Sequence, residues 1–151
     1  PGQLRNAEEL LRGAGLLDRV RFHPADLLDP ATVVSPGFDA IWMSQFLDCF
    51  SEAEIVAILR RCAAAIPEHG RIYILEAFWD QQRFRAASFC LQMTSLYFTA
   101  IANGTSQMYR SDTFLACVHE AGLEVVSQHD GLGISHTLLV CRPRPVTLAA
   151  S

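Results

Sequence analysis

Three features are scarce in this sequence, and each absence argues against a class of protein. The 151 residues carry 12 lysines and arginines against 16 acids, without a basic stripe, so neither nucleic acid nor membrane is a predicted partner. The five cysteines are dispersed without a CxxC pair, which predicts no metal site and favours reduced thiols in a cytoplasmic protein. No apolar run reaches the ~20 residues of a membrane-spanning helix.

Hydrophobic residues, in contrast, make up half of the chain, enough for one packed domain. Apolar residues at helical spacing predict helices over 3–14, 51–66, 80–102 and 111–122. Short apolar runs predict strands at 20–22, 38–43, 71–78, 123–129 and 136–142. Helices alternate with strands, and the loop DGLGIS joins the last two strands, so we expect an α/β fold with a mostly parallel sheet and a C-terminal antiparallel hairpin.

The helix predicted over 80–102 is the most apolar segment, but polar residues interrupt it, so we expect it to be buried rather than membrane-spanning. Its large side chains are predicted to belong mainly to the core: Phe84, Phe89, Met93, Tyr97 and Phe98. Ser111 is predicted to cap the next helix.

Three acids fall at or just after predicted strand ends: Asp26, Asp48 and Glu76. In parallel α/β sheets, ligands bind at the carboxyl ends of the strands. A buried charge is costly unless it is paired, so Asp48, with apolar neighbours, is expected at the lip of a cleft. Structural alternatives remain open: Asp48 as a cap of the following helix, and Asp26 as an Asx-turn residue.

Three stretches in this order carry a family resemblance: DRVRFHPADLLDP, FDAIWMSQFLDCFSEAEIVAILRRCAAAIPEHGRIYILE and YRSDTFLACVHEAGLEVV. They resemble the class I S-adenosylmethionine-dependent methyltransferases, and within these the small-molecule O-methyltransferases of the acetylserotonin and caffeate type. The resemblance covers residues 1–142, with 143–151 as a loose tail. It implies the C-terminal portion of a catalytic domain with a Rossmann-like sheet that lacks its first two strands, because the family's glycine-rich cofactor loop is missing.

The resemblance implies a set of residues around the cofactor, S-adenosylmethionine. Asp26 stands where the family's acid contacts the adenine amino group, and Leu27 where an apolar side chain packs on the ring. Met43 and Ser44 end the strand that passes the methionine part of the cofactor.

The resemblance also implies catalytic positions. Asp48 falls where the family usually has its catalytic histidine, and Glu76 matches the acid that orients this base. A second such acid would fall at Met108. An aspartate, with an ordinary pKa of ~3.9, is a weaker base than a histidine at ~6.5 unless burial raises its pKa. Asp48 is thus either a retuned base or a hydrogen-bonding group for an acidic phenol.

Acceptor contacts are expected from Met93, Tyr97, Met108 and His136. Met93 and Tyr97 lie one helical turn apart, a spacing that suits a flat, apolar acceptor. His136 and His129 flank the hairpin loop. Each is a candidate substrate contact or base, and the alternative is that both are ordinary polar residues.

The predicted function is methyl transfer from S-adenosylmethionine to a hydroxyl of a small aromatic or polyketide-like acceptor, as part of a longer parent enzyme. One alternative is an enzyme of the same fold that runs another reaction, such as hydroxylation. Another is a catalytically silent fragment or binding module that forms a homodimer through open sheet edges.

Overall fold

The computed structural model of the chain describes residues 2–101 and 104–145. The chain forms two compact units, residues 1–32 and 33–151. The first contains helix α1 (Gly2–Gly13) and the 3₁₀ turn η1 (Leu17–Arg19). The strand predicted at 20–22 is wrong, because these residues pair with no other strand among the residues described, and a strand is stable only beside a neighbour.

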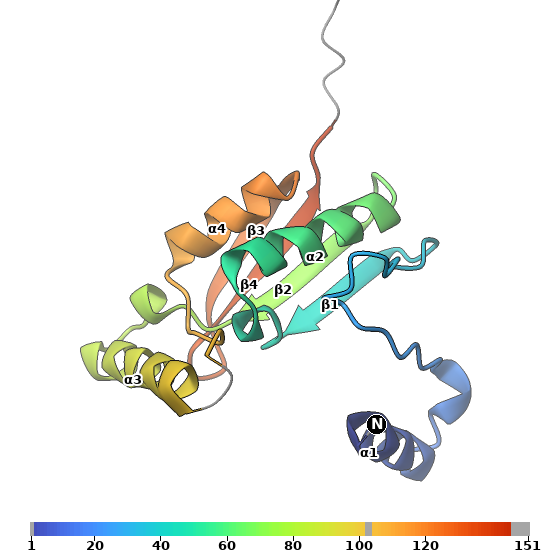
Figure 1. The fold of residues 1–151 in the computed structure, drawn as a ribbon, viewed down its shortest axis with the longest axis horizontal. Helices are drawn as coiled ribbons and strands as arrows, with labels where there is room; N and C mark the ends of the chain where they lie inside the picture. The colour runs from blue at the N-terminus through green and yellow to red at the C-terminus, as the bar shows by residue number, and fades with distance from the viewer. Residues whose placement is uncertain (1, 102–103, 146–151) are drawn as a thin grey trace, which may run out of the picture. The chain divides into compact units, whose positions relative to one another are not determined.

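A four-stranded sheet organises the second unit (Figure 1). Its strands are β1 (Ala40–Ser44), β2 (Arg71–Glu76), β3 (Leu123–Leu132) and β4 (His136–Pro143), in the order β1-β2-β4-β3. β1 and β2 are parallel, whereas β4 runs antiparallel to both of its neighbours. The α/β class and the C-terminal hairpin predicted from the sequence are confirmed, and residues 146–151 of the predicted tail lie outside the described residues.

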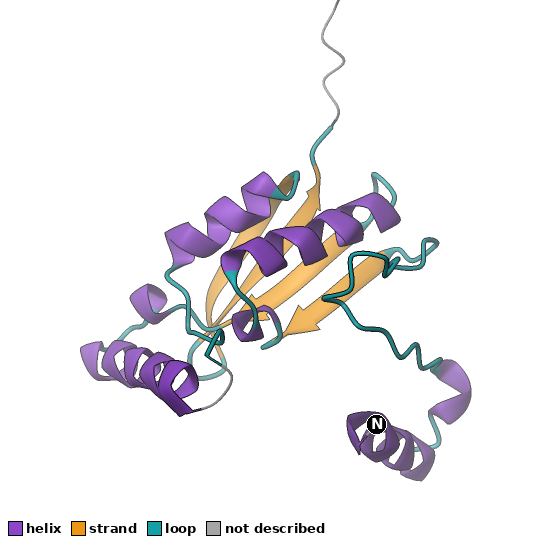
Figure 2. Ribbon diagram, in the orientation of Figure 1, coloured by secondary structure: helices purple, strands orange, loops and turns teal. Residues whose placement is uncertain are grey.

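Helices α2 (Glu52–Ala65) and α4 (Ser111–Glu120) cover the same face of this sheet (Figure 2). The strands turn alternate residues toward them, so that Ile72 and Ile74 are fully buried. α2 begins as the sequence predicts, since Glu54 Oε2 accepts hydrogen bonds from the N–H (2.8 Å) and the hydroxyl (2.7 Å) of Ser51. Most of the apolar core lies between these two helices and the sheet face that they cover.

Helix α3 (Arg85–Ile101) differs from its prediction in two ways. It starts later, because the 3₁₀ turn η3 (Trp79–Gln81) and the extended residue Gln82 precede it, and residue 102 lies outside the described residues. It is also not core: among its described residues none is buried, and Phe89 is 61% exposed. No described helix is both long and apolar enough to cross a membrane.

Candidate active site

The carboxyl ends of β1 and β2 lie side by side because the two strands are parallel and in register, Ser44 opposite Leu75. β4 starts at the same edge of the sheet, since Thr137 pairs with Glu76. The chain segments that carry Asp48, Glu76 and His136 therefore meet at one edge of the sheet.

Glu76 is the buried acid of this edge, with only 2% of its surface exposed. Its Oε1 atom accepts hydrogen bonds from the backbone N–H groups of Phe46 (3.0 Å) and Leu47 (2.9 Å). Its Oε2 atom is buried and lacks a hydrogen-bond partner among the residues described. Burial, together with the nearby charge of Asp48, raises the pKa of Glu76 to about 7, although the backbone hydrogen bonds favour the charged form.

A tight turn after β1 positions the two backbone N–H groups that cradle Glu76. Gln45 adopts a left-handed conformation (φ +45°), the only non-glycine residue in the described part of the chain to do so. Its N–H donates to the carbonyl of Leu75 (2.8 Å), and its side chain contacts Nε2 of His136. The turn presents the next two N–H groups to Glu76, an arrangement that suits an anion.

Asp48 lies in the 3₁₀ turn η2 (Leu47–Cys49) and is half-buried. Burial raises its pKa, while hydrogen bonds from Cys49 and the local backbone partly offset that effect. The thiol of Cys49 donates to Asp48 Oδ1 (3.5 Å). The N-cap of α2 is Ser51, bonded to Glu54 as described above, so among the described residues Ser51 and not Asp48 caps this helix.

The segment 104–110 fastens the Asp48 turn from the other side. The N–H of Gln107 donates to the carbonyl of Asp48 (2.9 Å), and the hydroxyl of Tyr109 donates to the carbonyl of Phe50 (2.6 Å). Tyr109 is 4% exposed and packs edge-on against Phe114. Sequence reasoning missed both donors, because a backbone N–H and a tyrosine in a loop carry no recognisable motif.

The same segment connects α3 to the site. The N–H of Met108 donates to Oγ of Ser95 (2.8 Å), a residue between Met93 and Tyr97 on the helix. Met93 and Tyr97 line a shallow, mostly apolar groove of about 340 Å³ together with Phe89. The structure therefore joins the segment holding Met108 both to α3 and to the turn holding Asp48, whereas His136 lies at the sheet edge near Gln45.

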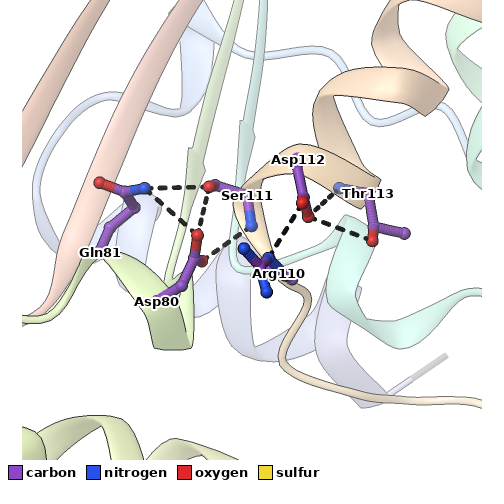
Figure 3. A network of polar contacts seen from close by, with 6 residues as sticks. All are labelled: Asp80, Gln81, Arg110, Ser111, Asp112 and Thr113. Atoms are coloured by element: carbon purple, nitrogen blue, oxygen red, sulfur yellow. Dashed lines mark hydrogen bonds and ion pairs between the residues drawn. The ribbon is translucent and has the colours of Figure 1, made fainter.

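A polar network at the start of α4 replaces the predicted serine cap (Figure 3). Ser111 is the first residue of the helix, and Asp80 of η3 caps it by accepting from its N–H (2.8 Å) and its hydroxyl (2.6 Å). Burial alone would raise the pKa of Asp80, but these hydrogen bonds outweigh it and lower the pKa. The only sequence clue to Asp80 is its position four residues after Glu76.

The residues implied for the cofactor lie in both units. Asp26 is exposed, and its Oδ1 accepts the N–H of Leu28 (2.9 Å), which is the Asx turn considered above. Leu27 is half-buried and Ser44 exposed. Met43 is 7% exposed and belongs to the core, so its side chain does not reach a ligand outside the core.

His129 and His136 do not face each other. Nε2 of His129 contacts Oγ of Ser127 (3.2 Å), whereas His136 contacts Gln45. Within residues 2–101 and 104–145, no three histidines, cysteines or acids converge as a metal site would require.

Parallel strands that end beside acidic residues, followed by an antiparallel hairpin, define a Rossmann-like α/β domain. Its family is identified by sequence: the chain belongs to the O-methyltransferase domain family, whose pattern matches residues 1–124. The resemblance seen in the three sequence stretches is therefore confirmed.

Several known methyltransferases are similar to this chain in sequence or in structure. The mitomycin biosynthesis 6-O-methyltransferase of Streptomyces lavendulae is 27% identical over 126 residues, which are 83% of this chain and 33% of that protein. The structure of the S-adenosylmethionine-dependent methyltransferase SibL is 27% identical (TM-score 0.77) and matches 95% of this chain and 42% of that one. The mitomycin 7-O-methyltransferase MmcR has the same fold, with a TM-score of 0.79 and 23% identity. The match covers 95% of this chain and 40% of that one. The chain thus spans well under half the length of these relatives.

Proposed function

We propose that this chain supplies the acceptor side of an S-adenosylmethionine-dependent O-methyltransferase that acts on a small aromatic hydroxyl compound. The observation that carries the proposal is the buried Glu76, cradled by two backbone N–H groups and left with one unpartnered oxygen beside the Asp48 turn. A carboxylate held in this way is costly unless it serves a function. Family membership and the names of the relatives support the choice of reaction.

Asp48, supported by Glu76, replaces the family's histidine as the base. Burial raises the pKa of both Asp48 and Glu76, and the charge of Asp48 further raises that of Glu76. A general base works best when its pKa lies near the working pH. Asp48, the more exposed of the two, accepts the proton of the acceptor hydroxyl, while Glu76 and its cradle hold the turn in place.

The cofactor, when bound, supplies a methyl group on a sulfonium, which becomes a neutral thioether as the acceptor oxygen is methylated. Within each unit taken by itself, the implied residues suit the chemistry of part of such a ligand. Asp26 has a second carboxylate oxygen, Oδ2, for the adenine amine, since only Oδ1 serves the Asx turn, and Leu27 follows it with an apolar side chain. Ser44 is accessible at the end of β1, whereas Met43 contributes only through its backbone.

The acceptor is positioned by α3 and by the segment that holds Met108. The groove at Met93 and Tyr97 offers apolar and aromatic surface for a flat ring system. The hydrogen bond between Met108 and Ser95, together with that between Gln107 and Asp48, links α3 to the turn that carries the base. His136, held by Gln45 at the sheet edge, provides a polar contact for the acceptor.

Replacing Asp48 by Asn tests the base directly. Turnover of the intact parent enzyme should fall at least about tenfold, because the amide cannot accept the proton. Asp39→Asn, at the other end of β1 and highly exposed, is the matched control and should leave turnover unchanged. Products are weighed by mass spectrometry: a gain of one oxygen instead of one methyl would refute methyl transfer. Calorimetric titration with S-adenosylhomocysteine measures separately whether this chain binds the cofactor.

We further infer that the protein works as a homodimer in a reducing, cytoplasmic environment. β1 is an edge strand with Trp42 59% exposed, a surface that favours pairing with a second copy. All five cysteines are free thiols, which is typical of a reducing compartment. Light scattering after gel filtration should give twice the monomer mass, and a clean monomer would argue against the dimer.

A further inference from the structure

A larger hollow lies apart from the Asp48 turn, between the start of α3 and the turn that joins β3 to β4. Its volume is about 630 Å³, in the range typical of small-molecule pockets. One wall is formed by residues 80–84, and the other by residues 130–135, which comprise the end of β3 and the turn to β4. Methyl transfer, as proposed above, makes no use of this pocket.

The side chain of Gln82 connects the two walls of the pocket. Nε2 of Gln82 donates to the carbonyl of Phe78 (2.7 Å) and to the carbonyl of Ser135 (3.0 Å). Gly131 and Gly133 have positive φ angles of 69° and 58°, and no atom lies within 4 Å of where their side chains would begin. The turn therefore offers its bare backbone to a ligand.

Apolar side chains flank the pocket and remain in contact with water. Phe84 is 62% exposed and Ile134 is 98% exposed, although both are large hydrophobic residues. A flat ring bound between them would bury apolar surface on both sides. The shape and lining of the pocket thus favour an aromatic ligand.

The charges of the pocket indicate what such a ligand carries. The guanidinium of Arg83 lies 5.2 Å from the centre of the Phe84 ring, and no salt bridge to Arg83 exists among the residues described. Asp80, on the same wall, is occupied by Ser111. Asp130, on the opposite wall, uses Oδ1 for hydrogen bonds from Thr137 (2.7 Å) and Gln128 (2.9 Å), which leaves Oδ2 for a donor.

We propose that this pocket binds a planar aromatic carboxylate whose ring also carries a hydroxyl group. The carboxylate pairs with Arg83, whose planar donors match it. The ring lies against Phe84 and Ile134. The hydroxyl donates to Asp130, which otherwise would repel a purely anionic ligand. This site is distinct from the groove on α3, so a ligand here binds whether or not the chain transfers methyl groups.

The test is a nuclear magnetic resonance titration of the whole chain with 6-hydroxy-2-naphthoate, and with 2-naphthol as the probe that lacks the carboxylate. We expect the amide signals of Gly131 and Gly133 to shift. Arg83→Gln should weaken naphthoate binding about tenfold or more while leaving the weak binding of 2-naphthol unchanged. Arg85→Gln is the matched control, an exposed arginine two residues further that does not line the pocket, and should bind like the wild type.

Three results would overturn the proposal. The first is the absence of binding. The second is a set of shifts confined to residues 46–50, which would place the probe at the proposed methyl-transfer site. The third is an equal loss of affinity in Arg83→Gln and Arg85→Gln, which would indicate general charge attraction instead of a built site. Binding is the readout throughout, so the outcome does not depend on whether the proposed methyl transfer is correct.

Discussion

Helices α2 and α3 have similar apolar content but opposite environments. α2 buries Ile55, Val56, Ile58, Leu59 and Cys62 against the sheet. α3 buries none of its described residues, and Phe89, Met93 and Tyr97 remain between 43% and 61% exposed. The difference comes from what lies opposite each helix in the described part of the chain: a sheet face for α2, and mainly η3 and the segment around Met108 for α3.

This contrast separates two uses of apolar surface. In the α2–α4 layer, apolar side chains stabilise the fold, and each is surrounded by others. On α3, exposed apolar side chains form a surface that is open to a ligand or a partner. Substitutions in the two regions should therefore have very different consequences for stability.

Phe114 tests the covered layer with the largest expected effect. It is fully buried in α4, with its ring centre 5.2 Å from that of Phe78. Phe114→Ala should lower the free energy of unfolding by about 3–5 kcal/mol, because it removes buried apolar surface and leaves a cavity. Urea denaturation followed by circular dichroism measures the change. A loss below about 1 kcal/mol would mean that the layer is not a packed core.

Glu76, a buried acid on the same covered face, should make stability depend on pH. Its pKa is raised from an ordinary 4.5 to about 7, so between these values the folded chain holds a proton that the unfolded chain has released. The free energy of unfolding should therefore fall as pH rises from 4.5 to 7, by about 3 kcal/mol in total. In Glu76→Gln most of this fall should be absent, and the smaller contribution of Asp48, whose pKa is also raised, should remain.

The control for Glu76 is the exposed Glu68→Gln, which should keep the pH dependence of the wild type. Unfolding free energies of the three proteins are measured across this pH range. Parallel curves for wild type and Glu76→Gln would show that Glu76 is charged at pH 5, contrary to its burial.

Asp80 lies where the covered layer meets the region of α3, and its effect should be intermediate. Asp80→Ala removes the cap from the first residue of α4 and should cost about 1 kcal/mol. Asp112→Ala, which breaks the exposed ion pair with Arg110 (2.9 Å) and the local hydrogen bonds from Thr113, should cost a few tenths of a kcal/mol. Thermal unfolding measures the loss of stability in both variants. Equal losses in Asp80→Ala and Asp112→Ala would contradict a capping role for Asp80.

Phe89 gives the smallest expected effect and completes the comparison with Phe114. Phe89→Ala removes the same ring from α3, where 61% of the residue is exposed. Stability should change by less than about 0.5 kcal/mol, as is usual for surface positions. The same urea denaturation applies, and a loss above about 2 kcal/mol would show that α3 is covered in solution.

Much of the fold could be predicted from the sequence because its patterns are local. The capping box at Ser51, the apolar runs of β1 and β2, and the glycines of the hairpin turn each act over a few residues. The exposure of α3 could not be predicted in this way, because an apolar helix has the same periodicity whether or not another element covers it.

The site was predictable only in part, for a related reason. Asp48 and Glu76 stood out as acids at strand ends, and family resemblance assigned them roles. Their cradle did not stand out, because it consists of a left-handed turn at Gln45 and two backbone N–H groups. The cap at Asp80 pairs residues 31 positions apart, a contact that no local pattern records.

The cradle of Glu76 also bears on how this site tolerates sequence change. Its donors belong to the main chain, so every amino acid except proline supplies them equally well at positions 46 and 47. Substitutions of the half-buried Phe46 therefore leave the carboxylate its support, whereas Leu47 is fully buried and is constrained by packing instead of by this hydrogen bond. The part of the site that is least visible in the sequence is therefore also the part that mutation is least able to remove.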